Sequence, residues 1–181
     1  LRAPLLLPLA LSACASRDEP EPLPSLVSGY RHLTPIRLNV AEIEIADPIA
    51  GAVRVYPGAP LPPDREMLRM AQDRLVAMGT EGRARFLPAA AELQREVLAG
   101  PGGVVGLFAG DPGERITCRL LCRLELVSAE GRRVAFVEAE ARRSRPEPDG
   151  ASPAARRRAA EGVVRQAMEE LNVEFEFQVR R

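Results

Sequence analysis

Polar and apolar residues alternate most strictly between residues 116 and 127. Every second position there is apolar: Ile116, Cys118, Leu120, Cys122, Leu124 and Leu126. A period of two predicts a strand with one buried face and one solvated face, as antiparallel sheets have. Ala129–Arg132 then has the composition of a hairpin turn. A second strand follows it, with inward positions at Ala135, Val137, Ala139 and Ala141.

Two more strands are predicted nearer the amino terminus. Ile36–Ile45 alternates but changes phase near Ala41, which is typical of a strand with a bulge. Arg83–Leu87 and Leu93–Val97 are interpreted as two pieces of one strand that is irregular around Pro88.

Two segments carry apolar residues at helical spacing. The first runs from Met67 to Met78, with Asp64 as the expected N-cap and Gly79 as the expected terminator. Its methionines are interpreted as core residues.

The second helix is predicted to begin at Ser152, a capping residue, followed by Pro153 at the first helical position. Its apolar face is Ala160, Val164, Ala167, Met168, Leu171 and Phe175. The last segment, Val173–Val179, alternates strictly and could form a strand instead. No glycine, proline or turn separates it from the helix, so one long helix is favoured.

These elements predict an α+β domain over residues 36–181. The expected order is β-α-β-β-β-α, with one antiparallel sheet of about four strands and two helices packed on one face. Such an arrangement would bury all the apolar sets together.

The first thirteen residues, Leu1–Ala13, carry one positive charge at Arg2 and a leucine-rich run. They are too few to span a bilayer, which takes about 20 residues, and their layout is typical of an export signal peptide. Small residues then lead into Cys14. An ordinary secretory signal with an incidental cysteine is the alternative interpretation.

Leu11-Ser-Ala-Cys14 resembles the lipobox of bacterial lipoproteins. The resemblance implies cleavage before Cys14, a diacylglyceryl thioether on its sulfur and an amide-linked acyl chain such as palmitate. Several chains are needed because one alone anchors only marginally. Ala15 and Ser16, rather than an aspartate, follow the cysteine. By the same resemblance the protein lies at the periplasmic face of the outer membrane.

Residues 14–35 are predicted to be the lipidated cysteine and its tether. Asp18–Pro24 is polar, contains prolines and has no hydrophobic period, so it is expected to be extended. The only histidine, His32, falls in this stretch and is interpreted as a solvated linker residue.

The composition argues against several function classes. Lys+Arg and Asp+Glu both number 25, so the chain is not an obvious nucleic-acid binder, and no nucleic-acid partner is expected. There is no nucleophile elbow and no cluster of metal ligands, so we expect no catalytic residue, no metal, and no cofactor beyond the covalent lipid on Cys14. The glycine-rich Gly100–Gly106 matches neither phosphate-binding fingerprint. The chain is therefore predicted not to be an enzyme.

Cys118 and Cys122 fall four residues apart in the strand predicted over residues 116–127. Their Cα atoms would lie about 13 Å apart, beyond the roughly 7 Å that a disulfide allows. Both are interpreted as buried core residues. No histidine or second cysteine pair stands nearby to complete a metal site.

Six arginines flank the loop before the last helix: Arg142, Arg143, Arg145, Arg156, Arg157 and Arg158. Guanidinium groups bind phosphates through paired hydrogen bonds, so this set is a candidate contact for anionic lipid. The alternative is a solvated surface on which these arginines pair with glutamates such as Glu138, Glu140, Glu147 and Glu161.

Cysteine, tether and element order together resemble LptE-type lipoproteins of lipopolysaccharide export and auxiliary lipoproteins of envelope ABC transporters. Arg37–Ala41, Met70–Leu75 and Leu171–Glu174 resemble segments of uncharacterised proteobacterial outer-membrane lipoproteins. The resemblance implies a lipid-anchored accessory protein with an outer-membrane barrel or an ABC transporter component as partner. The alternative is a free-standing lipoprotein that binds lipid or a small ligand without a stable protein partner.

Overall fold

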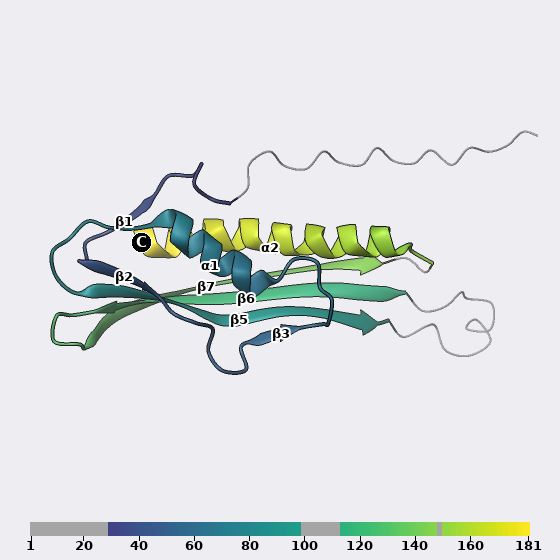
Figure 1. Ribbon diagram of the computed structural model, residues 1–181, viewed down its shortest axis with the longest axis horizontal. Helices are drawn as coiled ribbons and strands as arrows, with labels where there is room; N and C mark the ends of the chain where they lie inside the picture. Colours follow the sequence, from purple (N-terminus) through teal and green to yellow (C-terminus); the bar gives the residue numbers. More distant parts are fainter. Residues whose placement is uncertain (1–28, 99–112, 148–149) are drawn as a thin grey trace, which may run out of the picture.

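The computed structural model describes residues 29–98, 113–147 and 150–181, and it is an α+β structure (Figure 1). The predicted signal peptide, Cys14 and the glycine-rich segment Gly100–Gly106 lie outside the described residues. Within the described part, no helix combines the length and apolar character needed to cross a membrane.

Three long antiparallel strands form the body of the sheet: β5 (Arg83–Val97), β6 (Glu114–Val127) and β7 (Arg133–Glu147). The predicted alternation of β6 is confirmed, because Ile116, Cys118, Leu120, Cys122 and Leu124 are buried. The β6–β7 hairpin is confirmed as well, with Gly131 at φ 79° in its turn. Its inward alanines Ala139 and Ala141 are buried, whereas Ala135 is exposed.

The strand predicted as two pieces, Arg83–Leu87 and Leu93–Val97, begins and ends where expected. It is not divided, because β5 runs unbroken through Pro88. The register shifts between Pro88 and Ala90, so one extra residue is accommodated against β6. A proline cannot donate to a sheet ladder, and a bulge is where a central strand tolerates it.

The expected four-stranded antiparallel sheet is corrected to a mixed sheet of five strands. Both β2 (Glu42–Ile45) and β3 (Val53–Val55) pair in parallel with β5. A separate two-stranded sheet pairs β1 (Ile36–Leu38) in parallel with β4 (Leu75–Ala77). The observed order is therefore β-β-β-α-β-β-β-β-α.

The phase change near Ala41 thus marks the boundary between two separate strands, β1 and β2, and not a bulge within one strand. Ile36–Leu38 and Glu42–Ile45 belong to different sheets. The backbone N–H of Ala41 donates to the carbonyls of Glu81 and Gly82, so the chain crosses from one sheet to the other at this point.

The first helix, α1 (Pro63–Arg74), ends four residues before the predicted Met78. Its N-cap is Pro62, not Asp64, which lies in the first turn. The chain continues as β4, and Gly79 stands where an added Cβ would come within 2.7 Å of the Val40 nitrogen. Gly79 therefore permits close approach of the two backbones instead of capping a helix. Met67 and Met70 are core as predicted, but Met78 is 63% exposed.

The second helix, α2 (Pro153–Arg180), confirms the prediction of one long helix through residues 173–179. The Ser152 hydroxyl accepts a hydrogen bond from the Ala155 N–H at 3.2 Å, which confirms the cap. Figure 1 shows both helices on one face of the sheet. Every residue of the predicted apolar face is buried, and Phe175 packs edge-on against Phe86 of β5 at 5.7 Å.

Candidate functional site

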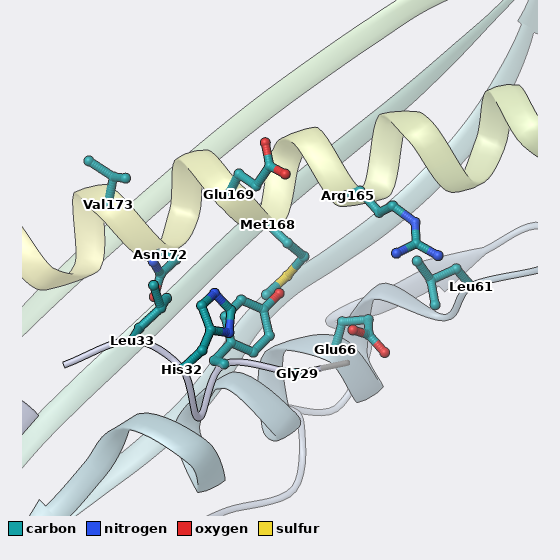
Figure 2. A pocket seen from close by; sticks show the side chains of 11 residues that line it. Gly29, His32, Leu33, Leu61, Glu66, Arg165, Met168, Glu169, Asn172 and Val173 are labelled. Carbon is teal, nitrogen blue, oxygen red and sulfur yellow. The ribbon is translucent and has the colours of Figure 1, made fainter. Parts of the chain in front are cut away.

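A groove of about 570 Å³ lies between α1, α2 and the segment that leads into β1 (Figure 2). Residues 29–33 of that segment, which belong to the predicted tether, form one wall. The helices contribute apolar and charged side chains: Glu66, Arg165, Met168, Glu169, Asn172 and Val173. This is the place where the predicted tether meets the folded domain.

Arg74, the last residue of α1, holds together the junction between residues 29–34 and the two helices. Its side chain is 1% exposed and donates three hydrogen bonds. Nε donates to the Thr34 carbonyl at 3.1 Å, Nη1 to Asn172 Oδ1 at 2.5 Å and Nη2 to Glu176 Oε2 at 2.5 Å. One guanidinium thus ties the entering segment to both helices, and Arg74 lowers the pKa of Glu176 below its usual range.

Asp73 supports the same junction from the neighbouring position. Its carboxylate accepts the backbone N–H of Tyr30 at 2.8 Å and Nε of Arg31 at 2.9 Å. The Tyr30 hydrogen bond is the main reason why the pKa of Asp73 is lowered. Residues 30 and 31 are therefore fixed to α1 by a carboxylate whose charged form these hydrogen bonds favour.

Sequence reasoning did not single out either residue. Arg74 follows Met67 by seven residues and Met70 by four, so it falls on the apolar stripe of α1. A charged residue on such a stripe must be paired when it is buried. The position of Arg74 on the apolar stripe was therefore the sequence signal that could have identified it as a buried, paired residue.

Tyr30 contributes a partly buried phenol to the groove. Burial raises the pKa of Tyr30, and the nearby charges of Glu66 and Glu169 raise it further. His32 lies exposed at the rim, in keeping with its interpretation as a solvated residue. Among the described residues, no three His, Cys, Asp or Glu side chains gather as a metal site. The arrangement is suited to holding a binding partner by charge and shape.

The six arginines predicted to contact anionic lipid do not share one surface. Arg143 and Arg145 alternate with Arg142 along β7, so they lie on the opposite face from it. Arg143 pairs with Glu170 at 3.2 Å, while Arg142 borders a small cavity on the open face of the sheet. The lipid contact as a single six-residue set stays a prediction.

The arginines of α2 also have carboxylate neighbours. Arg157 pairs with Glu161 at 3.2 Å, one of the pairs considered from the sequence, and Arg156 lies 3.9 Å from Glu114. The other glutamates considered there have different partners, since Glu138 pairs with Arg123 and Glu140 with Arg119 across the open face.

Cys118 and Cys122 are free and fully buried, which confirms their interpretation as core residues. Burial raises the pKa of each thiol to about 12. Both are therefore unreactive at neutral pH, because the thiolate is the reactive form.

Comparison with protein-family models and with curated proteins gave no match. Among solved structures, the chain is similar to uncharacterized lipoprotein B from Nitrosomonas europaea, with 14% identity, TM-score 0.40, and coverage of 80% of this chain and 83% of that one. A neuraminyllactose-binding hemagglutinin homolog from Helicobacter pylori has 9% identity, TM-score 0.37, and coverage of 85% and 96%. A minor lipoprotein from Acinetobacter baumannii has 10% identity, TM-score 0.31, and coverage of 74% and 91%. Each TM-score is below 0.5, so these likenesses carry no argument about function.

Proposed function

We propose that this chain is a lipid-anchored periplasmic accessory protein of an outer-membrane or envelope assembly that transports lipopolysaccharide or other lipids. The observation that carries the proposal is the lipobox-like Leu11–Cys14, followed by a polar, proline-bearing tether. The anchor would hold the protein at the periplasmic face of the outer membrane. The proposal includes no catalytic step.

The junction at α1 and α2 supports this role. Arg74 and Asp73 hold residues 30–34 against the helices, so a lipidated tether would join the folded domain beside the groove. The groove is open and its walls carry Glu66, Arg165 and Glu169 beside apolar side chains. Such a mixed surface suits a protein partner better than an acyl chain, which needs an apolar lining.

The anchor is tested by replacing Cys14. Metabolic labelling with a fatty acid in a bacterial host should label the wild-type protein, and Cys14→Ser should abolish the label and release the protein from membranes. Cys118→Ala is the matched control, because Cys118 is buried and should leave labelling unchanged. A wild-type protein that carries no label and stays soluble would overturn the proposal.

The partner is tested by crosslinking from the groove. A photoreactive residue at Val173, which is 68% exposed and borders the groove, should capture a barrel or transporter component in whole cells. The same probe at Val134, 64% exposed on β7, is the control. If Val173 captures no protein and the purified lipoprotein carries bound lipid, the free-standing lipid-binding alternative replaces the accessory role.

A further inference from the structure

A second cavity of about 570 Å³ is lined by the loop after β3, by β5 and by the start of α2. The loop after β3 forms one wall, with Tyr56, Pro57, Gly58 and Pro60. Arg95 of β5 and the first residues of α2 complete it: Ala151, Pro153, Arg156 and Arg157. Three guanidinium groups from two distant parts of the chain therefore face one space.

Two side chains that line this cavity, Arg95 and Tyr56, each have a polar atom without a hydrogen-bond partner among the described residues. Among the residues that the structure describes, the buried Nε of Arg95 and the buried hydroxyl oxygen of Tyr56 have no hydrogen-bond partner. The Arg95 guanidinium stacks over the Tyr56 ring at 4.6 Å, which holds it in place without using its N–H groups. Its carboxylate neighbour, Glu147, lies 3.8 Å away, beyond hydrogen-bond distance. Buried donors of this kind normally have an acceptor.

The first turn of α2 lacks the negative charge that a helix start prefers. It contains no acidic residue, whereas α1 has Asp64 and Glu66 in its first turn. Arg156 and Arg157 instead add positive charge at the positive end of the helix dipole. An anion in the cavity would complement both the arginines and the dipole.

We propose that this cavity binds a phosphate group, with Arg95, Arg156 and Arg157 as donors and the Tyr56 hydroxyl as a further donor. Guanidinium groups pair with two phosphate oxygens at once, which a point charge cannot do. The phosphate belongs either to a free phosphate compound or to a lipid headgroup. The site does not depend on the anchor or on a partner in the groove, so its binding can be measured when both are absent.

Glu147 gives the proposal a specific prediction. Its carboxyl group is buried, lies behind Arg95, and competes with any anion for that guanidinium. Removing the competing charge with the isosteric Glu147→Gln should strengthen phosphate binding several-fold. An arginine cluster with a purely structural role would show no such gain.

The test is titration calorimetry on the full-length acylated protein in neutral detergent micelles. Inorganic phosphate and pyrophosphate are the free probes, and short-chain phosphatidylglycerol against short-chain phosphatidylcholine is the headgroup probe. Binding of the free probes indicates a phosphate compound, whereas binding of phosphatidylglycerol alone indicates a lipid headgroup. Binding of none of them overturns the proposal.

Variants then locate the binding. Arg95→Gln and Arg157→Gln should each weaken it about tenfold, the effect of losing one charge-assisted hydrogen bond. Arg157 is 69% exposed, so its replacement does not endanger folding. Arg142→Gln is the matched control, because Arg142 lies on β7 outside this cavity. Equal loss with Arg142→Gln, or no loss with Arg95→Gln and Arg157→Gln, would contradict the site.

Discussion

Arg74, the last residue of α1, and Arg95 on β5 differ in how the fold uses their hydrogen-bond donors. The Arg74 side chain is 1% exposed and its three nitrogens donate to Thr34, Asn172 and Glu176. The Arg95 side chain is 27% exposed, and its Nε has no hydrogen-bond partner within the described part of the chain. One guanidinium is fully used by the fold, while the other is held in position and left available.

The difference teaches how to tell a structural charge from a binding charge. Burying a charge without partners lowers the free energy of unfolding. A buried arginine with a structural role must therefore donate its N–H groups to acceptors within the protein. Arg74 does so at the point where the entering segment meets both helices. Arg95 contacts Tyr56 and Glu147 and lines the cavity at the start of α2.

Replacing Arg74 should have the largest effect on stability. Arg74→Met keeps the length of the side chain but leaves Asn172, which is 9% exposed, without its partner. Loss of one member of a buried polar cluster predicts a decrease of about 3 kcal/mol in the free energy of unfolding. Urea unfolding of the Cys14→Ser protein measures it, and Arg69→Met, on the exposed side of α1, is the control. An equal effect of both variants would contradict the role given to Arg74.

The next effect is at Asp73 and depends on pH. The pKa of Asp73 is lowered in the folded state, so its stabilisation is complete above the unfolded pKa of about 3.9 and is lost as pH falls through the folded value. Asp73→Asn should therefore lower the free energy of unfolding by about 1 kcal/mol at pH 7, since a charged hydrogen bond becomes neutral.

The same comparison at low pH checks the sign. As pH falls below about 3.9, the carboxyl group of the unfolded chain is protonated first and that of the folded protein only at the lower pH of its lowered pKa, so the difference between wild type and Asp73→Asn should shrink toward zero through this acid range. Urea unfolding from pH 7 down to pH 3 would show it. A difference that stays constant across this range would mean that the charge of Asp73 does not matter.

The elements that sequence could predict are those fixed by neighbouring residues. The β6–β7 hairpin and the Ser152 cap of α2 are such local features, and both were predicted correctly. The segment Ile36–Ile45 was predicted wrongly as one strand. Its two halves pair with different strands, β4 and β5, which lie about 40 residues further along the chain. A hydrophobic pattern shows which side of a strand is buried, but not which strand lies beside it.

The candidate sites follow the same rule. Arg156 and Arg157 were found from the sequence because they adjoin, whereas Arg95 and Tyr56 join them only through the sheet and the loop after β3. Arg142 was grouped with them by proximity in sequence, yet the alternation of β7 places it on the other face from Arg143. The residue types indicated that arginines could bind an anion. Which arginines line the same cavity could be known only from the topology of the fold.

A third change would sharpen the contrast between Arg95 and Arg74. Replacing Arg95 and Glu147 together by Met and Leu removes a partly buried charge pair whose closest atoms lie 3.8 Å apart, beyond hydrogen-bond distance. Such replacements are often neutral or stabilising, so the free energy of unfolding should stay equal or rise by about 1 kcal/mol. Phosphate binding should weaken in the same protein. A loss of stability as large as that of Arg74→Met would show that Arg95 serves the fold.

The smallest effect is expected at Arg157, where the fold has a positive charge that it does not need. The side chain is 69% exposed, and its pair with Glu161 on the helix surface contributes little. The positive end of the α2 dipole opposes its charge, so Arg157→Gln should change the free energy of unfolding by about 0.5 kcal/mol or less. Thermal unfolding without phosphate measures this value. With phosphate present, wild type should gain stability and Arg157→Gln should gain less, since a ligand stabilises the state that binds it. An equal gain in both proteins would place the phosphate away from Arg157.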